Sequence, residues 1–133
     1  MQLIASLFLP LLMLFHLVGP VPGDLGVHNG QLSPCSSTAH CASLTWVQTD
    51  PKASFETLAE VAAGLPRSIV VEQEDGYLHA EVSSALFGFV DDLELLRLDD
   101  AQEIQARSIS RLGDSDLGVN ARRLVQLDAA LEG

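Results

Sequence analysis

Arginine side chains are concentrated in one short stretch of an otherwise acidic sequence. The chain has seven Lys and Arg residues against eighteen Asp and Glu, and four of those seven lie between Arg107 and Arg123. Arginine is the side chain best suited to bidentate contact with a carboxylate or a phosphate. The stretch is therefore a candidate site for a small anionic or polar ligand. The alternative is a structural network in which these arginines pair with the protein's own carboxylates.

Three residues of this stretch are candidate ligand contacts. Arg107 and Arg111 lie four residues apart on a predicted strand and so share one of its faces. Ser115 stands where the last helix is expected to begin, and free N–H groups at a helix start can receive an anion. Asp114 and Asp116 compete for that role, because an acidic side chain can cap the same N–H groups.

Histidine and carboxylate residues in two neighbouring segments are candidates for acid–base chemistry. His79 and Glu81 alternate on one segment, whereas Asp92 and Glu94 alternate on another. No nucleophile motif accompanies them, so the sequence leans against an enzyme and we predict no catalytic residue and no cofactor. Alternation also sends Asp91 to the opposite face, which argues against a metal site made of three carboxylates. His79, Asp92 and Glu94 therefore join the candidate ligand-binding residues only.

The overall charge excludes one class of partner. The formal net charge is −11 at pH 7, and residues 1–23 contain no Asp, Glu, Lys or Arg. A strongly acidic domain repels polyanions, so we predict that the protein does not bind nucleic acid.

The amino-terminal residues have the composition of an export or anchoring segment. Leu3 to Val18 is an almost unbroken apolar run, and Gly and Pro residues end it before the first charge at Asp24. The run is shorter than the roughly 20 residues that a spanning helix needs, and no basic residue precedes it. We predict a signal peptide or an N-terminal membrane anchor at residues 1–23, followed by a single domain at residues 24–133. Either alternative makes the domain exported (periplasmic, lumenal or extracellular) or anchored to a membrane.

Two cysteines follow this segment in a region rich in turn-forming residues. Cys35 and Cys41 are close in sequence, and in an oxidising compartment such a pair most simply forms a disulfide. Two alternatives remain, namely free thiols and a metal site that includes His40. The metal alternative lacks a fourth ligand, which structural zinc sites require.

The remaining pattern predicts an α+β fold. Apolar residues recur at helical spacing from Ser54 to Leu65. Runs typical of strands follow at residues 68–72, 77–83, 89–98 and 103–109, and a second helix is expected from Asp114 to about Leu131. The order α-β-β-β-β-α predicts an antiparallel sheet of about four strands with two helices on one face.

A hairpin at the turn after Leu98 gives this sheet a specific register. Leu98 then faces Glu103, and Glu94 lies opposite Arg107 on one face of the sheet. Arg111 has Asp92 or Asp114 as a candidate partner, whereas Arg122 and Arg123 are expected in solvent on the last helix. The buried stripe of that helix is predicted to comprise Leu117, Asn120, Ala121, Leu124, Leu127 and Leu131.

Several short motifs together resemble one known family. They are Asp24-Leu25-Gly26-Val27, the two cysteines with five residues between them, the segments at 77–81 and 87–94, and above all the block from Arg107 to Asn120. This combination resembles the family called domain of unknown function 1499, over essentially residues 24–125. Ser83 and Ser84 depart from that pattern, since an arginine is common there in the family. The resemblance implies a domain boundary and no mechanism, because the family has no assigned activity.

The sequence thus predicts an exported or membrane-anchored domain without catalytic activity. Its favoured role is binding a small anionic or polar ligand near Arg107 and Arg111. The alternative role is an interaction or assembly module at the non-cytoplasmic face of a membrane. An enzyme that uses His79 and nearby carboxylates is the least favoured of the three.

Overall fold

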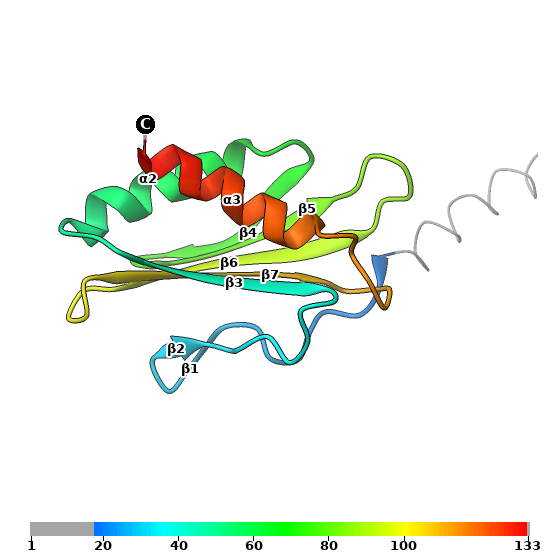
Figure 1. The fold of residues 1–133 in the computed structure, drawn as a ribbon, viewed down its shortest axis with the longest axis horizontal. Helices are drawn as coiled ribbons and strands as arrows, with labels where there is room; N and C mark the ends of the chain where they lie inside the picture. The colour runs from blue at the N-terminus through cyan, green and yellow to red at the C-terminus, as the bar shows by residue number, and fades with distance from the viewer. Residues whose placement is uncertain (1–17, 133) are drawn as a thin grey trace, which may run out of the picture.

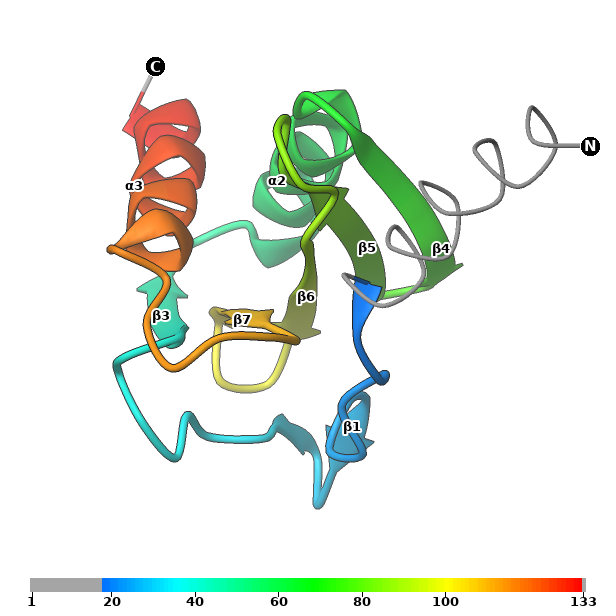
Figure 2. The ribbon, with the colours of Figure 1, turned by 90° about the vertical axis from the view of Figure 1, so that its right-hand side faces the viewer.

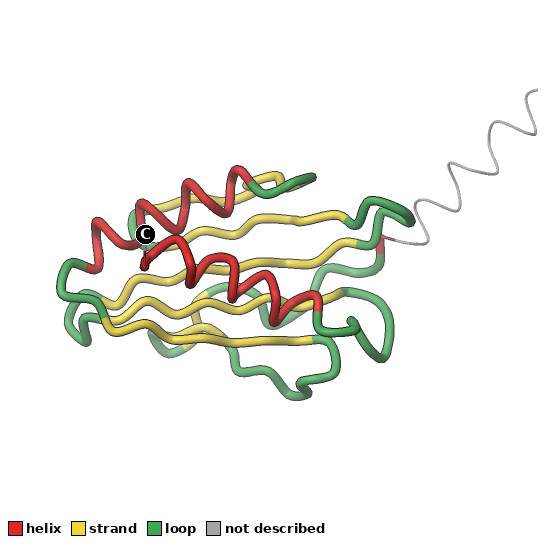
Figure 3. Tube along the Cα trace, turned by 45° about the horizontal axis from the view of Figure 1, so that its top comes forward, coloured by secondary structure: helices red, strands yellow, loops and turns green. Residues whose placement is uncertain are grey.

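Residues 18–132 of the computed structural model form a five-stranded antiparallel sheet with two helices on one face (Figures 1 and 3). The structure describes these residues, so most of the predicted signal peptide or anchor lies outside the described part of the chain. Within residues 18–132 no helix has both the length and the apolar character needed to cross a membrane.

The strand order of the sheet is β3-β7-β6-β5-β4. The strands are β3 (Cys41–Val47), β4 (Ser68–Glu74), β5 (Tyr77–Ser83), β6 (Val90–Leu98) and β7 (Glu103–Ser110). The predicted α+β class and the antiparallel arrangement are confirmed. The strand that the sequence analysis missed is β3, which makes five strands rather than about four. Ala42, Leu44 and Trp46 of β3 alternate with more polar residues, so the period-2 signal was present in the sequence.

The pairing of β6 with β7 has the predicted register. Leu98 lies opposite Glu103 and Glu94 lies opposite Arg107. Because side chains alternate between the faces of a strand, this register puts Glu94 and Arg107 together on one face and Leu93 and Leu95 on the other.

The first helix, α2 (Pro51–Gly64), begins three residues before the predicted start at Ser54. The reason is a better cap, because Asp50 Oδ1 accepts a hydrogen bond from the backbone N–H of Ala53 at 3.2 Å. Proline is also favoured in the first helical turn, where its missing N–H costs nothing. The helix therefore starts at Pro51, and Ser54 lies inside it.

The second helix, α3 (Val119–Glu132), begins later than Asp114. Leu117 precedes the helix in a turn with φ of +55° and is 83% exposed, so its predicted place in the buried stripe is wrong. Ala121 is also exposed. Asn120, Leu124 and Leu127 are buried as predicted, and Leu131 is partly buried against the core.

The hydrophobic core lies between the two helices and the sheet. Leu58 and Ala62 of α2 and Leu127 of α3 are fully buried against it. The sheet contributes residues from all five strands; its fully buried ones are Leu78, Ala80, Leu93, Leu95 and Ile104. Apolar side chains therefore fill the helix-covered face of the sheet, and the other face carries buried polar and charged groups.

The amino-terminal segment crosses part of that other face. It includes a small hairpin of β1 (Val27–His28) and β2 (Gln31–Leu32), which lies below the sheet in Figure 1. The segment then turns into β3 at the sheet edge, as the end-on view of Figure 2 shows. The amino-terminal segment therefore covers part of the polar face of the sheet and shields that part from solvent.

Candidate functional site

Charged side chains are buried on the face of the sheet that the amino-terminal segment covers. Asp92 and Glu94 of β6 are each 0% exposed, and Arg107 of β7 is 2% exposed. A buried charge is costly unless it is paired and hydrogen-bonded. The partners of these three groups therefore determine what the face can do.

Glu94 accepts hydrogen bonds from three donors. The Tyr77 hydroxyl and the Gly26 N–H each donate to Oε2 at 2.7 Å, and Arg107 Nη1 donates to Oε1 at 3.4 Å. Burial raises the pKa of Tyr77, and its bond to the Glu94 carboxylate raises it further. Tyr77 therefore stays a donor at physiological pH, and Glu94 is held without any need for an external ligand.

Arg107 makes its shortest ion pair with a residue that the sequence analysis did not predict. Its Nη2 donates to Asp24 Oδ2 at 2.7 Å, shorter than the contact with Glu94. The side chain of Asp24 is 50% exposed, whereas that of Arg107 is 2% exposed. Arg107 Nε is buried and has no hydrogen-bond partner among the described residues. One donor of this guanidinium is therefore free, and another is occupied by a half-exposed carboxylate.

A second cluster lies beside the first on the same face. Arg111 Nε donates to Asp92 Oδ2 at 2.8 Å, and Arg111 Nη2 donates to Glu81 Oε2 at 2.7 Å. His79 Nε2 lies 2.7 Å from Asp92 Oδ1. Arg111 thus has Asp92 as its partner, one of the two candidates from the sequence, and Glu81 as a partner that was not predicted.

The hydrogen bonds and charges in this second cluster determine the protonation of Asp92 and His79. Burial alone would raise the pKa of Asp92, but hydrogen bonds from His79 and Arg111 outweigh it and lower that pKa. The hydrogen bond to Asp92 raises the pKa of His79, against the opposing effect of burial. Asp92 is therefore ionised and accepts, so His79 Nε2 carries the proton of their bond. The cluster is a satisfied ionic network with Arg111 at its centre.

The His79 side chain is nearly buried and engaged within this network. His79 is 8% exposed, and its Nε2 is already engaged by Asp92. None of the described hydrogen bonds joins His79 to a Ser, Thr or Cys that could act as a nucleophile. Within residues 18–132 no group of three or more His, Cys, Asp or Glu side chains has the arrangement of a metal site.

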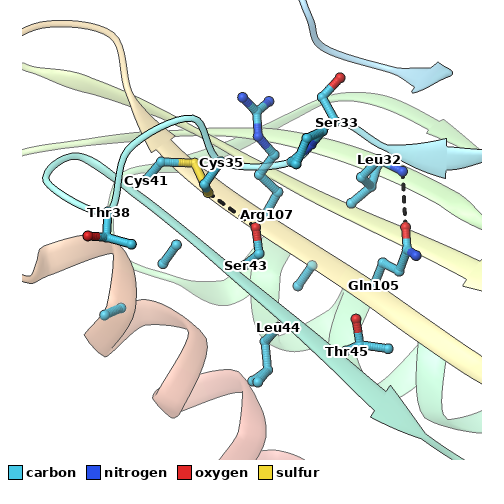
Figure 4. Close-up of a pocket in the computed structure, with 14 residues that line it drawn as sticks. Leu32, Ser33, Cys35, Thr38, Cys41, Ser43, Leu44, Thr45, Gln105 and Arg107 are labelled. Carbon is cyan, nitrogen blue, oxygen red and sulfur yellow. Dashed lines mark hydrogen bonds between the residues drawn. A yellow bond between two sulfur atoms is a disulfide. The ribbon is translucent and has the colours of Figure 1, made fainter.

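An open groove lies beside the first cluster, between the segment at residues 32–38 and the edge of the sheet (Figure 4). Its volume is about 550 Å³, within the range of small-molecule sites. Polar side chains point into it from β3 and β7; its residues are Leu32, Ser33, Pro34, Cys35, Thr38, Cys41, Ala42, Ser43, Leu44, Thr45, Gln105, Ala106, Arg107 and Ala121. Arg107 is the one charged residue in this lining, and its buried guanidinium is paired with Asp24 and Glu94.

A disulfide fixes one wall of the groove. Cys35 and Cys41 are bonded, with an S–S distance of 2.05 Å, which confirms the disulfide prediction. The hydroxyl of Ser43 donates to Cys35 Sγ at 3.1 Å, and Gln105 Oε1 accepts from the Leu32 N–H at 3.0 Å (Figure 4). These bonds tie the amino-terminal segment to the sheet on both sides of the groove. A disulfide is typical of a non-reducing compartment.

Five of the six predicted ligand-binding residues lie together on the polar face, and Ser115 does not. His79, Asp92, Glu94, Arg107 and Arg111 form the two clusters described above. Ser115 is exposed in the loop before α3, where its hydroxyl accepts from the Leu117 N–H. The helix start is closed by Asp116, whose carboxylate accepts from the N–H groups of Gly118 and Asn120. Asp116 therefore occupies these two N–H groups itself.

The prediction that Arg123 lies in solvent is wrong. Its Nη1 pairs with Asp91 Oδ2 at 2.9 Å, and both side chains are 11% exposed. Asp91 points to the helix face of the sheet, as its alternation with Asp92 predicted. Arg123 therefore lies toward the sheet, where it pairs with this carboxylate. Arg122 is exposed as expected and donates to the Leu117 carbonyl oxygen.

The groove residues Ser43, Thr45 and Gln105 were missed by the sequence analysis. Each is polar and lies on the same face of the sheet as Arg107, since Ser43 pairs with Arg107 and Thr45 with Gln105. Recognising β3 from its alternation would have identified them.

Comparison with known proteins gives a family and no activity. Residues 27–131 match the family described as Protein of unknown function (DUF1499), and a search of curated proteins finds no match. The chain therefore belongs to the DUF1499 family.

Proposed function

We propose that this member of the DUF1499 family is a non-catalytic binding domain of an exported or membrane-anchored protein. Its ligand is a small molecule that carries a carboxylate or phosphate group, bound in the groove beside the Cys35–Cys41 disulfide. The observation that carries the proposal is Arg107, a buried guanidinium in the wall of an open groove with an unpartnered Nε.

The charge of the groove supports an anionic ligand. Arg107 is the one charged residue of the lining, and Asp24 reaches its Nη2 from the half-exposed amino-terminal segment. A ligand carboxylate can replace Asp24 at Arg107 without changing the charge balance around Glu94, and a phosphate would add up to one further negative charge there. A bidentate contact that also uses Nε would satisfy the donor that the protein leaves free.

The remaining lining suits a polar molecule of modest size. Ser43, Thr45 and Gln105 offer hydroxyl and amide groups along β3 and β7, and Leu32 and the disulfide offer apolar contact. Pockets that orient a ligand through a few polar groups on a mostly apolar wall are typical of binding sites. The absence of a histidine or carboxylate from this described lining favours binding over catalysis.

The test is a thermal-shift screen of the purified full chain against phosphate, small carboxylates and uncharged polyols, followed by titration of any compound that raises the Tm. Thr45→Phe fills the groove, and Val47→Phe is the matched control, because Val47 shares the strand and face but not the groove lining. We expect Thr45→Phe to weaken binding of the anion about tenfold or more and Val47→Phe to leave it unchanged. Polyols alone raising the Tm, or equal affinity in both variants, would overturn the proposal.

The second candidate function is assembly with a partner chain through β4. This strand is an outer edge of the sheet, and Ile69 and Val71 on it are 65% and 48% exposed. An exposed edge can accept a further strand from another chain. Sedimentation across a concentration series tests this, since Ile69→Lys with Val71→Lys must abolish any self-association that the wild type shows.

A further inference from the structure

Exposed apolar side chains are concentrated in two loops at one end of the sheet. One loop joins β5 to β6 and carries Leu86, Phe87 and Phe89, which are 79%, 50% and 38% exposed. The other joins β7 to α3 and carries Leu117, which is 83% exposed. With Val119, these residues are five of the eleven exposed large hydrophobics in the described chain. Such a concentration marks a surface that contacts something apolar.

The two loops form one continuous surface. Phe89 from the first loop, Leu112 and Leu117 from the second and Val119 at the start of α3 line a common hollow of about 470 Å³, whose lining also includes Asp91 and Asp116. The rings of Phe87 and Phe89 lie 5.6 Å apart, so the aromatic pair is part of the same surface. We call this surface, made by residues 84–89 and 112–119, the apolar end.

Leu117 is held in solvent by the hydrogen bonds around it. Its φ of +55° is in the left-handed region, which residues other than glycine seldom adopt. Asp116 Oδ1 accepts from the Gly118 N–H at 2.7 Å, and Arg122 Nη1 donates to the Leu117 carbonyl oxygen at 2.9 Å. These bonds fix the turn that points the side chain outward. A rigid turn that exposes a leucine is better explained by a contact outside the chain than by chance exposure.

The amino-terminal apolar run enters the domain at this same end. Gly19 is packed so closely on the second loop that a Cβ there would lie 2.7 Å from Leu112 Cγ. Figure 1 shows the start of the described chain and both loops at the same end of the molecule, and Figure 2 views it from that end. Leu3 to Val18 is an uncharged, almost wholly apolar sequence that leads directly to this point. Any bilayer that holds this run is therefore adjacent to the apolar end.

We propose that the apolar end rests on a lipid bilayer, with Leu86, Phe87 and Leu117 inserted at the boundary between headgroups and acyl chains. Aromatic and aliphatic side chains are the residues that bind at this depth. The loop at residues 84–89 carries no charge, and residues 112–119 carry two carboxylates, Asp114 and Asp116, and no lysine or arginine. The surface therefore suits a zwitterionic lipid such as phosphatidylcholine rather than an anionic one.

This contact would orient the domain relative to the membrane. The strands of the sheet run away from the apolar end, since Val90 and Ser110 lie near it and Leu98 and Glu103 lie at the far end of β6 and β7. The inference is independent of the ligand groove, because neither loop contributes a residue to the groove lining.

The test places a single tryptophan at the apolar end of the full chain, reconstituted in phosphatidylcholine vesicles with and without brominated acyl chains. Leu86→Trp and Leu117→Trp report on the two loops. Val47→Trp is the matched control, because Val47 is 75% exposed at the opposite end of the sheet. The native Trp46 is 7% exposed and gives the background in the wild type.

We expect brominated lipid to quench the added emission of Leu86→Trp and Leu117→Trp by about half or more, since interfacial residues lie about 5–10 Å into the boundary. The added emission of Val47→Trp should be unchanged. Equal quenching at all three positions, or none at either loop, would overturn the proposal. Concentration-dependent dimerisation that buries Leu117 without lipid would also overturn it, because the surface would then bind a second copy.

Discussion

Arg107 of β7 donates a hydrogen bond to the carboxylate of Asp24 at 2.7 Å, across 83 residues of chain. The arginine is buried and the aspartate is half-exposed in the segment that covers the polar face. One ion pair thus connects the first charged residue of the sequence with β7, an inner strand of the sheet. It both fastens the amino-terminal segment and occupies the guanidinium that the ligand would use.

Asp24→Asn should lower stability and raise anion affinity together. The amide removes the charge that compensates Arg107, and loss of one partner from a half-buried pair costs about 1–3 kcal/mol, between the values for exposed and buried pairs. The same change frees Arg107 Nη2 for an external carboxylate or phosphate. Urea unfolding and anion titration of the purified chain measure the two effects.

Asp100→Asn is the control for this prediction. Asp100 is exposed, and the substitution makes the same change in net charge, so we expect a stability change within about 0.5 kcal/mol and unaltered anion binding. A variant at Asp24 that lost stability but gained no anion affinity would limit the ion pair to a structural role.

The register of β6 with β7 could be predicted because a short turn joins the two strands. The turn after Leu98 sets the pairing of β6 with β7, and a period of two then puts Glu94 opposite Arg107. Strand β3 was harder to predict, since its partner β7 begins more than fifty residues after β3 ends and no hairpin joins them.

The contacts that were not predicted join segments of different local structure. No shared repeat of residues in the sequence therefore indicates that they pair. Asp24 lies in irregular chain before β1, where no repeat indicates which strand it reaches. Arg123 was placed in solvent because it lies outside the predicted buried stripe of the last helix. Asp91 on the facing strand is a nearly buried carboxylate, and the Arg123 side chain of α3 lies toward the sheet to pair with it.

The His79–Asp92 pair should make stability depend on pH. The bond to Asp92 raises the pKa of His79 in the folded protein. The pair's contribution to the free energy of unfolding is therefore fully present below the ordinary histidine pKa of about 6.5, and it is lost as pH rises through the pKa of His79 in the folded protein. The wild type should exceed His79→Gln in stability by more at about pH 5.5 than at about pH 8.5. Urea unfolding of both proteins at each pH measures this difference in stability. The contributions of all other titrating groups are common to the two proteins and cancel in the difference.

The nearby carboxylates Glu81 and Glu94 act in the same direction, since both favour the protonated imidazole. A gap between wild type and variant that stays constant over this pH range would mean that His79 keeps one charge state throughout. A gap that widens as pH rises would contradict the assigned direction of the pKa shift.

Removing the disulfide should destabilise the domain by a moderate amount. Cys35→Ala with Cys41→Ala releases a short loop, whose closure is worth about 2 kcal/mol on the chain-entropy estimate. Because Cys35 and Cys41 also line the groove, the double variant should bind the anion more weakly than the wild type does. Unfolding of the variant and of the oxidised wild type gives the first quantity, and titration gives the second. Unchanged stability would indicate that the amino-terminal segment is already fastened by Asp24.

Arg123→Ala should be far more damaging than the same change at the adjacent Arg122. Arg123 neutralises Asp91, which is 8% exposed, and also donates to Ser108 Oγ and Asn120 Oδ1 at 3.0 Å. Its removal leaves a buried carboxylate without a cation, at a cost of about 2–4 kcal/mol. Arg122 is exposed, so its loss should cost about 0.5 kcal/mol or less. The two variants differ by one position and carry the same charge change, so a similar loss of stability in both would show that net charge, rather than the buried pair with Asp91, determines the effect.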